Sequence, residues 1–253
     1  MTMLSKFKFF EDWDTQYAEK GLKRAEHFLK ISKKYADFEE KMVLDLGCGN
    51  GYLSMEAAKV TSTVVALDIR SRILKDFKAS KLFKEKIIEL VADATYLPFK
   101  SGTFESVFSY DLYEHVSNQE QLLNEIFRVA KKGGCIALST GNKLFPKDRH
   151  TGLWFIDYLP KRLADAYVRS FKGWREGSYN VHQPNYWSLR TKLSKHTRQF
   201  IIDGNSVLEM FRQVYPETYR KLGASLVAIL NSAMLLGFFK FFTPKYFIFA
   251  RKT

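Results

Sequence analysis

Residues 43–52 read Val43-Leu44-Asp45-Leu46-Gly47-Cys48-Gly49-Asn50-Gly51-Tyr52, a short apolar run that leads into three alternating glycines. The run predicts a buried strand, and the glycines predict a turn where backbone approaches a ligand closely, because glycine has no Cβ and tolerates positive φ. Dinucleotide-binding proteins use G-x-G-x-x-G, but Tyr52 stands where their third glycine would be. Asp45 precedes the first glycine by two residues. A carboxylate there suits an amine-bearing or cationic ligand better than a pyrophosphate.

Strands and helices alternate on both sides of this turn. Strands are expected at 41–46, 62–67, 87–91, 106–110 and 135–139, helices at 53–59, 71–83 and 119–130, and two last strands at 200–202 and 246–250. This order predicts an α/β fold with a doubly wound, mostly parallel, seven-stranded sheet of the Rossmann-like type. Ligands of such sheets bind outside the carboxyl ends of the strands, so residues that follow each strand are the candidates for a site.

Residues 40–140 resemble the class I S-adenosylmethionine-dependent methyltransferases, in particular the group related to quinone biosynthesis and the type 11 methyltransferase domain. The resemblance rests on residues 45–51, on Asp68 and Asp93 after the next two strands, and on residues 110–116. It implies S-adenosyl-L-methionine as cofactor, with its amino-acid end in the glycine turn, its ribose hydroxyls on Asp68 and its adenine amino group beside Asp93. The cofactor-binding residues that it implies are Asp45, Gly47, Cys48, Gly49, Asp68, Ile69, Asp93, Ala94 and Tyr110. Taken singly, Asp68 and Asp93 are also typical of helix N-caps, but their joint spacing favours the cofactor.

Four segments are expected along the chain. Residues 1–40 form an N-terminal helical segment, 41–140 the cofactor-binding core, 141–198 an inserted substrate cap, and 199–253 the last strands with an apolar helix between them. The cap is expected because the regular alternation stops after Thr140, where aromatic residues, Gly and Pro become frequent.

Two histidines are the candidates for a catalytic base, because transfer to a hydroxyl needs a group that accepts its proton. His115 follows the fourth strand, and its other interpretation is a residue that shapes the pocket without moving a proton. His150 lies in a loop with Asn142 and Pro146, a combination found in similar methyltransferases of lipid and polysaccharide pathways; its other interpretation is a polar loop residue. His182 stands behind these two as a weaker candidate. No Cys/His cluster has metal-ligand spacing, so no metal is expected.

The acceptor is expected to be small or lipid-linked, such as a sugar, a quinone-type ring or a lipid, and to be methylated on oxygen. The aromatic cap favours a ring-shaped or apolar acceptor, unless those aromatics form the cap's own core. Residues 109–113 lack the Asn/Asp-Pro-Pro-aromatic signature of enzymes that methylate exocyclic amines. The net charge of +13 keeps two other partners open, nucleic acid and an anionic membrane. A tRNA or rRNA methyltransferase and a non-catalytic binding protein with this fold are therefore the alternatives.

Residues 224–239 form an apolar stretch near the C-terminus. It is slightly short for a membrane span and contains Asn231, so a buried or cap-packed helix is the first expectation. A helix on a membrane surface is the second, supported by flanking cations. No secretory signal is evident, and Cys48 and Cys135 do not form a disulfide framework. A cytoplasmic protein, with peripheral membrane contact as a further option, is expected.

Overall fold

The computed structural model describes residues 15–71, 85–172, 181–215 and 239–253. One seven-stranded sheet has the order β3-β2-β1-β4-β5-β7-β6. Its strands are β1 (Met42–Leu46), β2 (Thr63–Asp68), β3 (Ile87–Val91), β4 (Phe104–Tyr110), β5 (Ala130–Gly141), β6 (Phe200–Asp203) and β7 (Lys245–Arg251). The first five are parallel and β7 is antiparallel to both of its neighbours. The predicted doubly wound, mostly parallel sheet of seven strands is confirmed.

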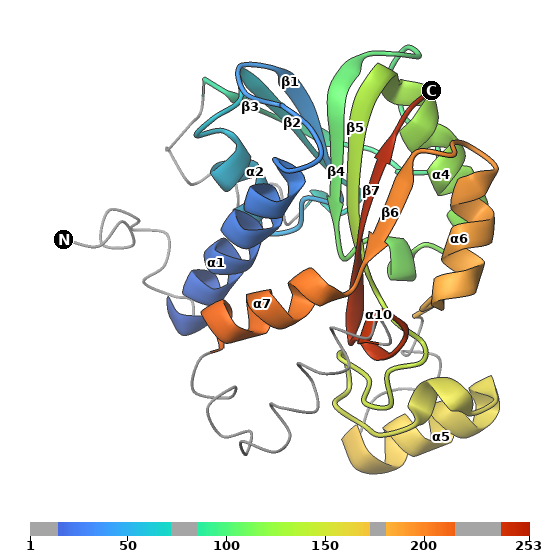
Figure 1. Ribbon diagram of the computed structural model, residues 1–253. Helices are drawn as coiled ribbons and strands as arrows, with labels where there is room; N and C mark the ends of the chain where they lie inside the picture. Colours follow the sequence, from blue (N-terminus) through green and yellow to red (C-terminus); the bar gives the residue numbers. More distant parts are fainter. Residues whose placement is uncertain (1–14, 72–84, 173–180, 216–238) are drawn as a thin grey trace.

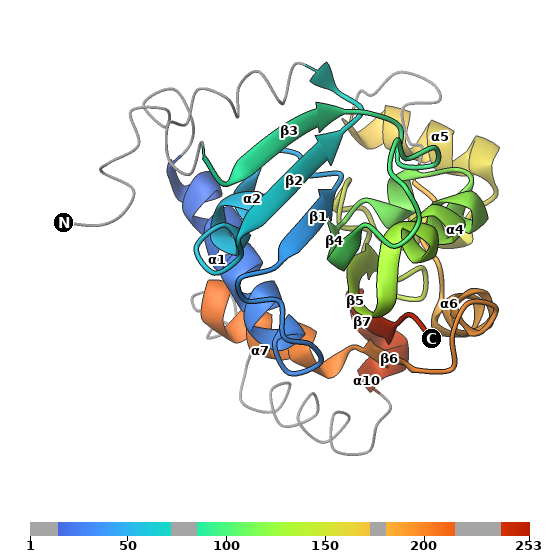
Figure 2. The same ribbon diagram turned by 90° about the horizontal axis from the view of Figure 1, so that it is seen from above.

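Helices cover both faces of the sheet (Figures 1 and 2). One layer holds α1 (Thr15–Ser32), α2 (Tyr52–Ala57) and α7 (Asn205–Val214), and the other holds α4 (Gln119–Val129) and α6 (Tyr186–Ser194). Phe28 of α1 is fully buried against aromatic rings of β4 and β7. Leu122 of α4 is equally buried on the opposite face. Burial on both faces explains why the central strands read as continuous apolar runs.

The connection from α4 to β5 differs from its prediction. The helix ends at Val129 rather than 130, and the strand begins at Ala130 rather than 135. Pairing with β4 shifts register here, because Phe104 pairs with Ala130 and Ser106 with Cys135. Gly133 takes a φ of 74° within this irregular segment. Gly133 and Gly134 therefore allow a bulge inside β5, at a place where the sequence predicted only the end of a helix.

The segment after β5 leaves the sheet and returns to it. It contains α5 (Lys161–Lys172), which lies beyond the carboxyl ends of the parallel strands in Figure 1. The chain comes back as α6, whose Leu189 and Leu193 are fully buried against the sheet. Part of the predicted cap, residues 141–198, therefore belongs to the helical layer of the core.

Some expectations fall on other residues. Three predicted segments lie wholly or largely outside the described residues. They are the helix expected at 71–83, residues 1–14 of the N-terminal helical segment, and residues 224–238 of the apolar stretch. Within those described, no helix combines the length and apolarity needed to cross a bilayer.

Candidate functional site

A cleft of about 690 Å³ opens at the carboxyl ends of β1, β2, β3 and β4, and α1 forms one of its sides. Strand ends of a parallel sheet meet at one edge, which explains why residues distant in sequence gather here. All nine residues that the sequence predicted for cofactor binding line this cleft: Asp45, Gly47, Cys48, Gly49, Asp68, Ile69, Asp93, Ala94 and Tyr110. Their contacts with a cofactor stay predictions.

The glycine turn between β1 and α2 has the expected backbone. Gly47, Gly49 and Gly51 have φ angles of 73°, 49° and 75°, which side chains other than glycine rarely adopt. A Cβ on Gly47 would meet the Leu112 side chain at 2.9 Å, whereas a Cβ on Gly49 would meet nothing within 4 Å. Gly47 is therefore required by packing, and Gly49 leaves open space beside the cleft.

Asp45 brings a carboxyl group to the base of this turn. It is 1% exposed and accepts a hydrogen bond from Ser54 Oγ at 2.5 Å. Burial raises the pKa of Asp45 to about 7, with a further contribution from the negative charge of Asp68, and the Ser54 hydrogen bond offsets only part of this. A buried carboxylate of this kind is stabilised by a cation beside it.

The two other predicted carboxylates make different local contacts. Asp68 Oδ2 accepts a hydrogen bond from the Gly49 backbone N–H at 3.1 Å, so this side chain ties β2 to the glycine turn. Its Oδ1 accepts from the backbone N–H of Arg70 at 2.9 Å and lies 3.2 Å from Arg70 Nε, whose side chain is 64% exposed. Asp93 Oδ1 accepts from the backbone N–H and the hydroxyl of Thr95, which closes a tight turn.

Helix α1 contributes cleft residues that the sequence did not single out, among them Tyr17 and Arg24. Arg24 NH1 donates to the Tyr215 hydroxyl at 3.1 Å. Burial alone would lower the pKa of Arg24, but neighbouring phenols and Asp111 raise it. No motif marks these positions, because only packing against α2 and α7 places α1 at the cleft.

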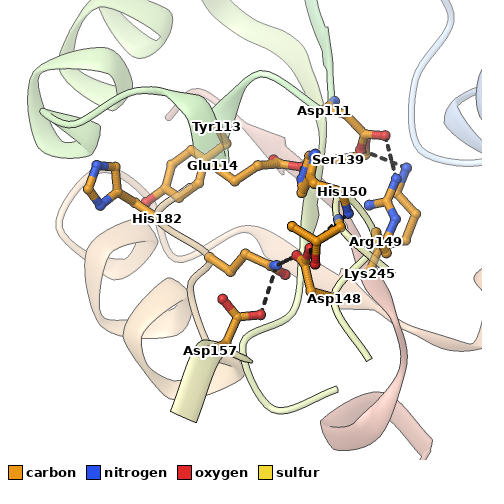
Figure 3. Close-up of polar contacts among 12 residues, drawn as sticks. Asp111, Tyr113, Glu114, Ser139, Asp148, Arg149, His150, Asp157, His182 and Lys245 are labelled. Carbon is orange, nitrogen blue, oxygen red and sulfur yellow. Dashed lines mark hydrogen bonds and ion pairs between the residues drawn. The ribbon is translucent and has the colours of Figure 1, made fainter. Parts of the chain in front are cut away.

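His115 lines the cleft just after β4 and belongs to a cluster with Glu114 and His150, whose side chains Figure 3 shows. Its ring packs edge-on against His150, with centroids 4.9 Å apart. Glu114 is 0% exposed, and its Oε1 lies 3.9 Å from His150 Nε2, beyond hydrogen-bond distance. Neither carboxyl oxygen of Glu114 has a hydrogen-bond partner in the described part of the chain.

This cluster has unusual electrostatics. Burial raises the pKa of Glu114 and lowers the pKa of His150, so both groups are shifted toward their neutral forms. Together with His115 they offer three metal-ligand-type atoms within 4.8 Å of one another. The sequence marked Glu114 only as part of the 110–116 motif, because its burial and its proximity to His150 arise from the fold.

Beside the cluster, Asp111 anchors a set of ion pairs. Its φ is 58°, and its carboxylate oxygens accept hydrogen bonds from Ser139 Oγ at 2.7 Å and from Arg149 Nη2 at 2.8 Å. Its Oδ1 also forms an ion pair with Lys245 Nζ at 2.7 Å. Although burial favours the neutral form, the cations Arg149 and Lys245 hold the pKa of Asp111 well below its usual range. Lys245 is 1% exposed, and burial lowers its pKa to about 7.

The loop that carries His150 is fixed from within. Asp148 Oδ2 accepts from the backbone N–H groups of His150 and Thr151, at 3.0 and 2.6 Å. Gln183 Nε2 donates to Asp148 Oδ1 at 2.9 Å, which joins the loop to the segment that leads into α6. His182 points elsewhere: its ring lies beyond Tyr113 from His150 (Figure 3), and only its backbone N–H contacts the cluster, at the Glu114 carbonyl. The structure therefore unites His115 and His150 but not His182.

Comparison with known proteins identifies a methyltransferase domain at residues 44–138. The chain is 32% identical over 105 residues to a ubiquinone biosynthesis O-methyltransferase of Thiobacillus denitrificans, which covers 41% of this chain and 45% of that protein. It is 28% identical over 134 residues to the chloroplastic tocopherol O-methyltransferase of Arabidopsis thaliana, which covers 50% of this chain and 38% of that protein. The matches thus span less than half the length of either relative.

A solved structure shares the fold over most of the chain. It is an S-adenosylmethionine-dependent methyltransferase of Mesorhizobium loti, with a TM-score of 0.59, 17% identity, and coverage of 89% of this chain and 98% of that one. The family match begins within β1 and ends within β5, so it contains every strand end that borders the cleft. The chain therefore carries a methyltransferase domain at residues 44–138 and shares its fold with an S-adenosylmethionine-dependent methyltransferase of known structure.

Proposed function

We propose that this protein transfers the methyl group of S-adenosyl-L-methionine to an oxygen atom of a small or lipid-linked acceptor. The observation that carries the proposal is one continuous cleft. Its lining includes a buried carboxyl group and a glycine turn, Asp45 and Gly49, and also an imidazole, His115. Such a cleft has separate places for a charged nucleoside and for a group that loses a proton.

The residues present fit that cofactor. The open space beside Gly49 leaves room for its amino-acid end, and ionised Asp45 would attract its ammonium group. Asp68 would accept hydrogen bonds from the ribose hydroxyls, in place of the exposed Arg70 side chain. Asp93 and Ala94 would border the adenine. The cofactor supplies an electrophilic methyl group on a sulfonium, so the protein needs no nucleophile of its own.

The proposed base is an imidazole at the acceptor end. His115 borders the cleft and His150 packs behind it. Burial keeps His150 neutral by lowering its pKa, which leaves a ring nitrogen able to accept a proton. This imidazole pair would take up the proton of the acceptor hydroxyl, and the cofactor, when bound, would supply the methyl group by loss of its methyl–sulfur bond and leave as a neutral thioether. Glu114 Oε1 lies 3.9 Å from His150 Nε2, so a proton on His150 would favour the ionised form of this buried carboxyl group, which would in turn stabilise the cation.

The proposed class of acceptor is supported by the names of two relatives rather than by a contact between particular side chains. Two relatives are named as O-methyltransferases of ubiquinone biosynthesis and of tocopherol. A ring-bearing hydroxyl compound with an apolar tail is therefore the acceptor that we propose to test first. The competing proposal, an RNA acceptor, rests on the net charge of +13. The third, a non-catalytic binding protein, would retain cofactor affinity without turnover.

One experiment separates these proposals. The purified chain is titrated calorimetrically with S-adenosyl-L-methionine and its demethylated product, and then incubated with methyl-labelled cofactor and a cell extract. Label in the organic phase supports a small or lipid acceptor, label in RNA supports the competing proposal, and binding without label supports the non-catalytic one. The Gly49→Val variant is the control, because its side chain would project into the open space by the cleft. Absence of any heat with either compound would reject the proposed function.

A further inference from the structure

We propose that the outer surface of the cap docks onto an anionic lipid bilayer. Six large apolar side chains are exposed between residues 154 and 171, although most such residues in the described chain are buried. We call them the cap patch: Trp154, Phe155, Tyr158, Leu159, Leu163 and Phe171. Their exposed fractions run from 37% for Leu159 to 68% for Phe171. Exposed aromatic and aliphatic groups gathered in this way typically mark a surface that meets a partner.

Two local groups of side chains make up the cap patch. The ring of Phe155 contacts those of Trp154 and Tyr158, with centroids 6.1 Å apart in each case. On α5, Leu163 and Phe171 share a stripe with Tyr167, whose ring is 5.0 Å from that of Phe171. The neighbouring face of α5 is buried inside the cap, where Ala164 and Val168 pack with Ile156. The exposed stripe is therefore left over after the cap has formed its own small core.

One residue of the cap patch is strained in a way that the cap's own packing does not explain. Phe155 has φ 59° and ψ 15°, the left-handed region that is unfavourable for a bulky side chain. Its ring is 58% exposed, so little burial compensates for this conformation. Strain that persists without a packing gain commonly serves a function. Here the conformation holds an aromatic ring outward beside Trp154.

Charge identifies the partner. Around the cap patch, the exposed cations are Lys143, Lys147, Lys161, Arg162, Arg169 and Lys172. Each of the three acids of the same stretch has a partner: Asp148 is bound within its loop, Asp157 accepts from Gln183, and Asp165 lies 3.7 Å from Lys161. Aromatic residues with a border of Lys and Arg are characteristic of protein surfaces that settle at the headgroup level of anionic membranes. An RNA partner would use the cations but leaves the exposed aliphatic side chains Leu159 and Leu163 without a role.

The position of the cap patch links it to the cleft. One short loop carries His150 at its inner end and Trp154 at its outer end, and a β-bridge between Lys147 and Trp154 closes it. In Figure 1 the same region, with α5, forms the end of the molecule beyond the carboxyl ends of the strands. A bilayer on the cap patch would therefore lie beside the acceptor end of the site. This step rests on the proposed function, whereas bilayer docking itself does not.

Vesicle co-sedimentation of the full chain tests the proposal without any activity measurement. Vesicles are made of phosphatidylcholine alone or with phosphatidylglycerol. We expect binding only with the anionic lipid, weakening as salt rises. The Arg162→Glu/Arg169→Glu variant should bind at least tenfold more weakly, from about fivefold per charge removed, while Lys100→Glu, outside the cap, should bind normally. Equal binding to both vesicle types, or none, would overturn the proposal.

The Phe155→Asn variant makes the test decisive, because asparagine tolerates the left-handed conformation. It should be at least as stable as the parent in thermal unfolding, and should bind anionic vesicles about tenfold more weakly, the loss expected for one aromatic side chain. Ile88→Asn, at a 56% exposed position of β3, is the matched control and should retain binding. Lower stability of Phe155→Asn would assign the ring a structural role and overturn the proposal. Unchanged vesicle binding by Phe155→Asn would also overturn the proposal. So would a change of the protein from dimer to monomer in this variant, if that change accounted for the weaker binding.

Discussion

The Asp45→Asn substitution separates what stabilises this fold from what its cleft is proposed to bind. Burial raises the pKa of Asp45 from 3.8 to about 7. At 1.36 kcal/mol per pH unit, this rise corresponds to roughly 4 kcal/mol. The folded protein then holds a proton that the unfolded chain has lost, so this group lowers stability progressively between pH 3.8 and about 7. Above that window the full cost remains, and below it the cost disappears.

Asparagine removes the charge and retains an oxygen for the Ser54 hydroxyl. Urea unfolding at several pH values should therefore show little difference between variant and parent near pH 4. The variant should become more stable by about 2–4 kcal/mol at pH 8, most of the cost calculated above. Asp37→Asn is the matched control, because the pKa of the exposed Asp37 is lowered by Lys41 and its loss should not stabilise the protein at any pH. Parallel pH profiles for parent and Asp45→Asn would refute the reasoning.

The same variant should lose affinity for the cofactor. In the parent, binding of an ammonium group requires ionised Asp45, so affinity for S-adenosyl-L-methionine should rise from pH 5.5 to 7.5. In Asp45→Asn the affinity should be weaker and nearly constant over that range. Calorimetry on both proteins would contradict the assignment if the two profiles had the same slope.

Three further predictions concern the cleft. Asp68→Ala should weaken cofactor binding by about 1–3 kcal/mol, because charge-assisted hydrogen bonds are lost; normal affinity by calorimetry would remove the ribose assignment. Gly47→Ala should destabilise the protein by about 1–3 kcal/mol, since the new Cβ meets the Leu112 side chain at 2.9 Å in a strained conformation. Gly49→Ala should lower stability less and cofactor affinity more, and equal urea midpoints for the two variants would contradict this contrast. His150→Ala should lower turnover about 10²–10⁴-fold at unchanged cofactor affinity, the usual contribution of a general base; retained turnover in the variant would reject His150 as the base. A chelator should leave the turnover of the parent unchanged, and a loss of turnover would instead assign the cluster of Glu114, His115 and His150 to a metal.

The sequence was sufficient to predict the parts of the cleft that depend on residues close together in the chain. A glycine turn between a buried strand and a helix needs its residues in one short stretch, so residues 43–52 could be recognised directly. Asp68 and Asp93 were also predictable, because a parallel sheet presents the end of each successive strand at the same edge. The sheet itself followed from alternating apolar runs. The bulge between α4 and β5 was missed, since its glycines equally fit a helix end.

The cluster around Glu114 and Asp111 was decided by tertiary structure alone. Asp111 meets Arg149 and Lys245 from two distant parts of the chain, and neither pairing leaves a periodic or spaced signal in the sequence. In the sequence Glu114 stands out only as part of the 110–116 motif. Burial beside His150 raises the pKa of its carboxyl group, which has no hydrogen-bond partner among the described residues. Burial and long-range proximity come from how layers pack, whereas residue type and spacing come from the chain. The sequence therefore determined where the glycine turn of the cleft lies, and the fold determined which titratable side chains gather beside it.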